Sequence, residues 1–141
     1  MEYVTSNTSI ALLGYIGIFL VSLLMLATLR VTLSLKGKKR ANDFSPTGED
    51  VSEFSRRLVR THANMYEFFP VFGGLLLYAL ATGQTAVTNG LALAFLGARI
   101  LQALIHLFST SIMAVQIRFA FFLAQFVIAI IWILKFFGIL A

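Results

Sequence analysis

Hydrophobic residues form long runs along the chain, and polar residues gather in short segments between the runs. Apolar character dominates residues 9–35, the later half of 53–81, and the segments 86–108 and 116–137. A helix needs about 20 residues to cross the hydrocarbon core of a membrane. The pattern therefore predicts an all-α fold, an integral membrane four-helix bundle with up-down-up-down topology, formed by residues 1–141 as a single domain.

Composition favours a membrane protein over a soluble one. Of the 141 residues, 59% are hydrophobic and 12% are charged, and the mean hydropathy is +0.89. Soluble domains carry about 25% charged residues. The chain has no cysteine, which excludes disulfides, thiolate metal sites and a thiol nucleophile borne by the protein. Any thiol chemistry must therefore use the thiol of a ligand.

Basic residues cluster in and beside the first connection, whereas the second connection has none. The cluster consists of Lys36, Lys38, Lys39, Arg40, Arg56 and Arg57. Because Lys and Arg mark cytoplasmic loops, we expect the first and third loops on the cytoplasmic side and both termini on the opposite side. The formal charge of +5 thus reflects basic residues placed at one membrane interface, and no nucleic-acid partner is expected.

Arginines inside the predicted spans are the main candidate functional residues, because ionisable groups in a bilayer are costly and usually functional. They are Arg30, Arg60, Arg99 and Arg118. By the expected topology, all four approach the same side of the membrane. On the second helix, Asn64 and Glu67 follow Arg60 at i+4 and i+7, so the three side chains share one face. They could form one polar network.

The third helix repeats this pattern, with Arg99, Gln102 and His106 at i, i+3 and i+7. Glu67 alone cannot neutralise four arginines, so the excess charge favours a ligand that carries carboxylates. In the alternative reading, Arg60 and Glu67 neutralise each other and the other arginines reach the headgroups. Two isolated histidines on different helices make a poor metal site, and no metal is expected.

Residues 60–70, with the sequence RTHANMYEFFP, resemble the second-helix signature of the MAPEG family, the membrane-associated proteins in eicosanoid and glutathione metabolism. The resemblance extends over nearly the whole chain. It includes the arginine late in the first helix, the LGAR segment that ends at Arg99, and Arg118 at the start of the fourth helix. It implies a MAPEG-like homotrimer, with a bacterial-type member in the bacterial inner membrane as the expected setting.

The same resemblance implies that glutathione binds between adjacent subunits as a cosubstrate, while a lipophilic substrate enters from the membrane lipid. The glutathione-binding residues implied are Arg30, Arg60, Asn64, Glu67, Arg99 and His106. Arginines would hold the carboxylates, Glu67 would pair with the amine, and Asn64 would donate or accept a hydrogen bond nearby. Arg118 would be the catalytic residue beside the thiol, where a guanidinium stabilises the thiolate.

The implied function is that of a membrane-embedded, glutathione-dependent transferase or peroxidase that acts on lipophilic electrophiles. The alternative is a non-catalytic lipid- or glutathione-binding membrane protein, and a transporter ranks third because the polar groups stop near one face. Phe68, His106 and Phe122 stand where eicosanoid synthases of the family carry tyrosines. A specific eicosanoid synthase is therefore not inferred, and His106 is the hydrogen-bonding group left among the three.

Overall fold

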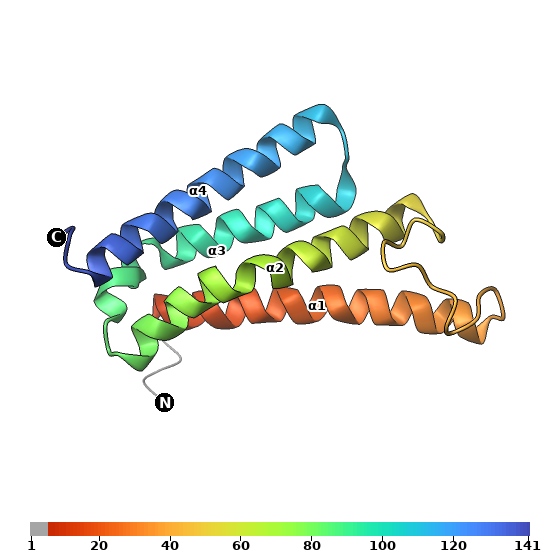
Figure 1. Ribbon diagram of the computed structural model, residues 1–141, viewed down its shortest axis with the longest axis horizontal. Helices are drawn as coiled ribbons and strands as arrows, with labels where there is room; N and C mark the ends of the chain where they lie inside the picture. The colour runs from red at the N-terminus through yellow and green to blue at the C-terminus, as the bar shows by residue number, and fades with distance from the viewer. Residues whose placement is uncertain (1–5) are drawn as a thin grey trace.

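The computed structural model describes residues 6–141. Within this range the chain forms four α-helices: α1 (Asn7–Leu35), α2 (Glu53–Ala81), α3 (Thr85–Phe108) and α4 (Ile112–Phe136). Successive helices run antiparallel, so the long α1–α2 loop and the α3–α4 loop lie at one end of the bundle (Figure 1). We call this the long-loop end. The expected all-α, up-down-up-down bundle is confirmed.

Serine side chains set where three of the helices begin. Ser6, Ser52 and Ser111 each accept a hydrogen bond from the backbone N–H three residues later. Such an N-cap satisfies one of the N–H groups that the first helical turn leaves free. α4 accordingly begins at Ile112, before the start expected near residue 116.

Three helices in residues 6–141, namely α1, α3 and α4, are long and apolar enough to cross a membrane. α2 matches α1 in length, at 29 residues, but its first half is polar. It packs against all three other helices, which cover part of its polar surface. The bundle therefore has the dimensions and the apolar surface of an integral membrane protein.

The core joins one large aromatic side chain from each helix. Tyr15 of α1, Phe72 of α2, Phe95 of α3 and Trp132 of α4 are all buried. The ring of Phe95 lies 6.3, 5.2 and 5.6 Å from the rings of Tyr15, Phe72 and Trp132, measured between centroids. Aromatic pairs at these separations add to the stability gained by burial. The polar residues described below lie between this core and the long-loop end.

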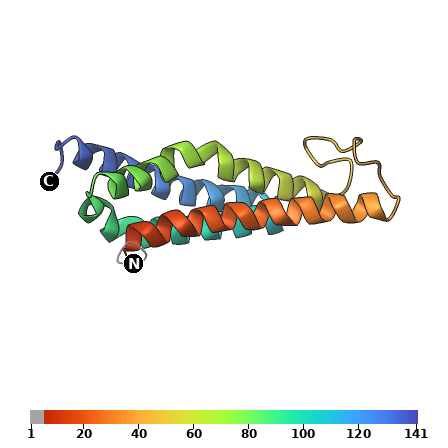
Figure 2. The ribbon, with the colours of Figure 1, turned by 90° about the horizontal axis from the view of Figure 1, so that it is seen from below.

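At the long-loop end α1 projects beyond α3 and α4, as both Figure 1 and Figure 2 show. With 29 residues, α1 is about 43 Å long. Because the hydrocarbon core is only about 30 Å thick, its ends reach the headgroup layer. The long loop between α1 and α2 therefore belongs to the interface with water.

Candidate functional site

A cationic cavity of about 360 Å³ lies at the long-loop end, where α2 begins, α3 ends and α4 begins. It is lined by Glu53, Arg56, Arg57, Arg60, His106, Thr110, Val115 and Arg118. Four guanidinium groups and one carboxylate share this space. With His106 neutral, the lining has an excess of three positive charges, which suits an anionic ligand.

α2 supplies three of these arginines from one helical face. Arg56 and Arg57 precede Arg60 by four and three residues, spacings that make helical side chains neighbours. Arg57 Nε donates a hydrogen bond to the carbonyl oxygen of Leu107 at 2.8 Å. This bond attaches the start of α2 to the last turn of α3 and so closes one wall of the cavity.

Arg118 enters the cavity from the second turn of α4, half-buried. Its Nε atom is buried and has no hydrogen-bond partner within residues 6–141. A buried donor without a partner costs about 1–3 kcal/mol. An anionic atom placed beside Nε would supply the acceptor. His106, which is 9% exposed, lines the same cavity.

Arg99, by contrast, is only 1% exposed, and its guanidinium forms hydrogen bonds to residues of its own protomer. Its Nε contacts Met65 Sδ at 3.4 Å, and Nη1 donates to Oε1 of Gln102 at 3.0 Å and of Gln125 at 3.4 Å. Nη2 donates to both the backbone oxygen and Oδ1 of Asn64. All five N–H groups of the guanidinium therefore have acceptors. Arg99 links α2, α3 and α4.

Two aromatic rings complete the surroundings of Arg99. Its guanidinium carbon lies 5.3 Å from the ring centroid of Tyr15 and 5.8 Å from that of Phe68. Ring faces attract cations, and more strongly where water is excluded. The Tyr15 hydroxyl donates to the backbone oxygen of Met65 at 2.7 Å. Neutral oxygens and ring faces, rather than a carboxylate, therefore stabilise this buried charge.

The structure divides the predicted site residues into separate groups. Arg60, His106 and Arg118 share the cationic cavity. Asn64 and Arg99 are bonded to each other in the core. Asn64 is therefore part of the Arg99 network, and within residues 6–141 no hydrogen bond or ion pair joins Arg60, Asn64 and Glu67 along the second helix. The ligand-binding roles of all these residues stay predictions.

Arg30 and Glu67 lie outside both groups. Arg30 contacts the long loop, and Glu67 lies at the midpoint of α2 with an exposed side chain. The ion pairs within residues 6–141 join Lys39 to Asp50 and Glu53 to Arg56. The described chain therefore has no Arg60–Glu67 ion pair, on which the alternative reading of the sequence depended.

Sequence reasoning missed several residues that the structure brings into these groups, among them Glu53, Arg56, Arg57 and Gln125. Beside the first connection, Arg56 and Arg57 indicate the orientation of the chain, but their spacing from Arg60 also places them on its face. Gln125 follows Arg118 by seven residues, two helical turns, in an otherwise apolar helix. A polar residue at that position is a detectable signal of a buried contact.

The fold and the cavity together define a small polytopic membrane protein with a candidate anion site near one membrane surface. A family model described as MAPEG family matches residues 10–138, and the chain belongs to this family. The resemblance noted in the sequence is confirmed. Comparisons with curated proteins and with solved structures found no match. Membership places the protein in the group of membrane proteins of glutathione and eicosanoid metabolism.

Proposed function

We propose that the protein is a membrane-embedded, glutathione-dependent transferase or peroxidase acting on lipophilic electrophiles, with Arg118 stabilising the thiolate. The observation that carries this proposal is the cationic cavity, in which four arginines meet at the long-loop end. Membership of the family supports glutathione as the anion. Apolar helices on either side give lipophilic substrates access from the bilayer.

The residues of the cavity fit the chemistry of glutathione, which has two carboxylates and one ammonium group. Arg56, Arg57 and Arg60 offer guanidinium groups that bind carboxylates in bidentate fashion. Glu53, in the same lining, offers a partner for the ammonium. Arg118 is then free to face the thiol, with its unpaired Nε available to the developing negative charge.

Arg118 acts by charge in this mechanism. Lowering the pKa of a ligand thiol by one unit requires about 1.4 kcal/mol of preferential stabilisation of the thiolate, which a half-buried guanidinium can supply. The thiol proton leaves to water at the interface. The sulfur then forms a bond to an electrophilic carbon, and the leaving group departs with the electron pair of the bond that breaks.

The peroxidase reaction uses the same activated sulfur. It attacks one oxygen of a lipid hydroperoxide, the O–O bond breaks, and the departing oxygen takes up a proton to give an alcohol. A second glutathione then reduces the sulfenic acid, yielding the disulfide and water. Two glutathione molecules are oxidised for each hydroperoxide reduced. Because glutathione supplies both electrons, the protein itself stays unchanged.

The loss of the family tyrosines leaves this chemistry to charged groups. Phe68 and Phe122 lie ring to ring, with centroids 5.3 Å apart, and neither carries a hydroxyl. His106 lies in the cavity lining with Arg118. Guanidinium charge, supported by the imidazole, is therefore the proposed source of thiolate stabilisation.

Assembly as a homotrimer is part of the proposal, and Glu67 supports it. Its carboxylate is exposed at the midpoint of α2, where an ionised side chain facing lipid costs about 2.5–3.5 kcal/mol on insertion scales. A second protomer packed over this face of α2 would cover the carboxylate. Glu67 would then lie in the subunit interface, shielded from the lipid.

Calorimetric titration of glutathione into detergent-purified protein tests the proposal. We expect saturable binding that Arg60→Gln weakens about tenfold, the loss expected for one charge-assisted hydrogen bond. Arg40→Gln, which removes an equal charge from the exposed loop, is the matched control and should bind like wild type. Absence of saturable binding, or equal losses in both variants, would contradict the proposed site.

Ultraviolet absorbance of the bound thiolate separates the enzyme from the non-catalytic alternative. An enzyme should show a thiolate signal at neutral pH that Arg118→Gln abolishes while glutathione still binds. Saturable binding without a thiolate signal in wild type would instead favour a lipid- or glutathione-binding protein.

A further inference from the structure

A second pocket, of about 380 Å³, lies where the projecting end of α1 meets the long loop. Its lining residues are Arg30, Val31, Ser34, Leu35, Ala41, Asn42 and Phe44. None of these residues lines the cationic cavity. The pocket combines a guanidinium, an amide and a hydroxyl with apolar side chains, and so has the amphipathic character of a membrane interface.

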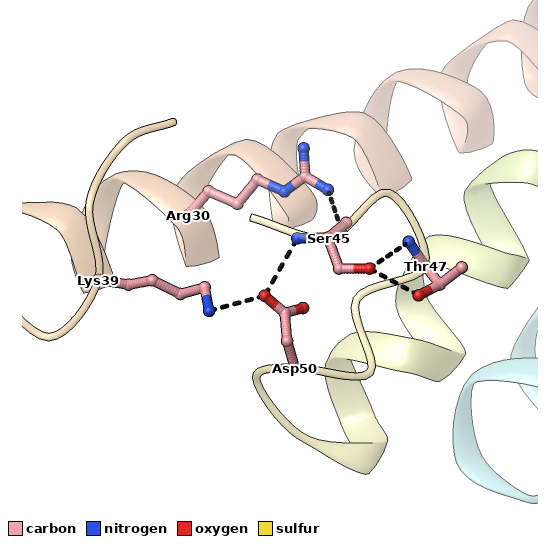
Figure 3. Close-up of polar contacts among 5 residues, drawn as sticks. All are labelled: Arg30, Lys39, Ser45, Thr47 and Asp50. Atoms are coloured by element: carbon pink, nitrogen blue, oxygen red, sulfur yellow. Dashed lines mark hydrogen bonds and ion pairs between the residues drawn. The ribbon is translucent and has the colours of Figure 1, made fainter. Parts of the chain in front are cut away.

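Arg30 reaches toward the long loop but is only lightly held there (Figure 3). Nη2 donates to the backbone oxygen of Ser45 over a long 3.5 Å, and the guanidinium carbon lies 5.6 Å from the ring centroid of Phe44. Within residues 6–141, the Arg30 side chain makes no hydrogen bond other than this one to Ser45. Its other N–H groups are therefore available to an acceptor from outside the protomer.

Within residues 6–141, no acid forms an ion pair with Arg30. Asp50 Oδ2 lies 2.7 Å from Lys39 Nζ and accepts a hydrogen bond from the backbone N–H of Ser45 at 3.0 Å, as Figure 3 shows. This carboxylate is thus committed to holding the loop together. The pocket retains the positive charge of Arg30.

An apolar strip leads from the pocket along α1 toward the bilayer. Leu24, Val31 and Leu35 are 66%, 56% and 83% exposed, and their spacing of i, i+7 and i+11 places them on one side of the helix. The end of α1 lies at headgroup depth, because the helix is longer than the hydrocarbon core is thick. A bound molecule can therefore contact both the polar pocket and the apolar strip.

We propose that this pocket binds the phosphate of an anionic phospholipid, with an acyl chain lying along the strip of Leu24 and Val31. Arg30 binds the phosphate oxygens, and Asn42 and Ser34 contribute hydrogen bonds from the pocket wall. A free phosphate would use the polar groups but not the strip. A zwitterionic lipid is disfavoured, because its cationic head would face Arg30 and the exposed Lys36 nearby.

The test uses the detergent-purified chain and phosphatidylglycerol carrying a fluorescent label on its acyl chain, with binding followed by anisotropy. Raised salt screens the diffuse attraction of the loop lysines and leaves close contacts largely intact. Under that condition we expect Arg30→Gln to weaken binding about tenfold, and Asn42→Ala about threefold. Arg40→Gln, an equal loss of charge outside the pocket, should bind like wild type.

Several outcomes would overturn the inference. These are equal losses in Arg30→Gln and Arg40→Gln, or equal binding of tail-labelled phosphatidylcholine. Displacement by inorganic phosphate at the same concentrations as by unlabelled phosphatidylglycerol would indicate a phosphate site rather than a lipid site. Displacement by glutathione would instead assign Arg30 to the thiol site. Because Asn42 is exposed on the loop, Asn42→Ala keeps the test decisive if Arg30→Gln fails to fold.

Discussion

Arg99 of α3 holds Asn64 of α2 through two hydrogen bonds from a single guanidinium nitrogen, one to the backbone oxygen and one to the side-chain oxygen. The same guanidinium binds Gln102 and reaches Gln125 of α4. A full positive charge is thus buried on neutral acceptors. Arg99 and Arg118 are both arginines within apolar helices, but their surroundings differ. Arg99 joins three helices, whereas Arg118 lines a cavity.

Replacing Arg99 by Met should destabilise the protein strongly. The substitution keeps the length of the side chain but leaves Oδ1 of Asn64 and Oε1 of Gln125 without their donor, whereas Oε1 of Gln102 still accepts from Gln125. Each buried polar group without a partner costs about 1–3 kcal/mol, so we expect a loss of roughly 3 kcal/mol in the free energy of unfolding. Arg118→Met is the matched control and should change stability by less than about 1 kcal/mol. Reversible denaturation in detergent would measure both, and similar losses would contradict the assignment.

Arg118→Gln should lower turnover without lowering stability. Removing one group that stabilises developing negative charge typically costs a factor of about 10² to 10³ in kcat. Arg118→Lys, which keeps the charge, should retain more activity than Arg118→Gln. Conjugation of glutathione to an apolar electrophile gives the rates, and Lys135→Gln, at the far end of α4, is the control. Turnover of Arg118→Gln equal to wild type would exclude a role for Arg118 in catalysis.

Gly48 should tolerate no side chain. Its φ angle is +71°, and an added Cβ would lie 2.9 Å from the backbone oxygen of Ser55 and 2.8 Å from Val59 Cγ2. We expect Gly48→Ala to cost about 2 kcal/mol or more in unfolding free energy, because the left-handed conformation alone costs an alanine about 1–2 kcal/mol. Gly37 shares that conformation, with φ +67° and open space around it. Gly37→Ala should therefore cost clearly less, and equal losses would show that the close approach is unimportant.

The ion pair between Lys39 and Asp50 should hold the long loop in place only between an acidic and an alkaline limit of pH. The ion pair with Asp50 raises the pKa of Lys39, and the same pair lowers the pKa of Asp50. The contribution of Asp50 is therefore lost as the pH falls below its ordinary pKa of about 3.9, toward the lower folded-state value. The contribution of Lys39 is present below its ordinary pKa of about 10.4 and is lost at still higher pH.

Limited proteolysis of the loop across this pH range would measure the effect, with a protease that stays active at each pH. Cleavage should be slowest between the two limits. Asp50→Asn should accelerate cleavage at neutral pH. Glu49→Gln removes a neighbouring acid that takes no part in the ion pairs of residues 6–141, and should not accelerate cleavage. A pH profile that Asp50→Asn leaves unaltered would contradict this role of the ion pair.

The sequence by itself determined the helices, their approximate limits and their membrane setting. These properties depend on local composition and on runs of apolar residues, which can be read without knowledge of any neighbour. The sequence also shows the surplus of arginine over acid in the predicted spans, which indicates an anionic ligand. The sequence does not show the exact start of α4, because its N-cap, Ser111, lies outside the apolar run that marks the helix.

The tertiary structure alone decided which arginine lies in the core and which lines the cavity. Helical spacing places Arg60, Asn64 and Glu67 on one face, but it does not say which helix lies opposite each side chain. The acceptors of Arg99 come from α2, α3 and α4, and the walls of the cationic cavity come from the ends of the same three helices. Such contacts depend on how the helices are rotated against one another, which is set by packing across the whole bundle rather than by any single segment.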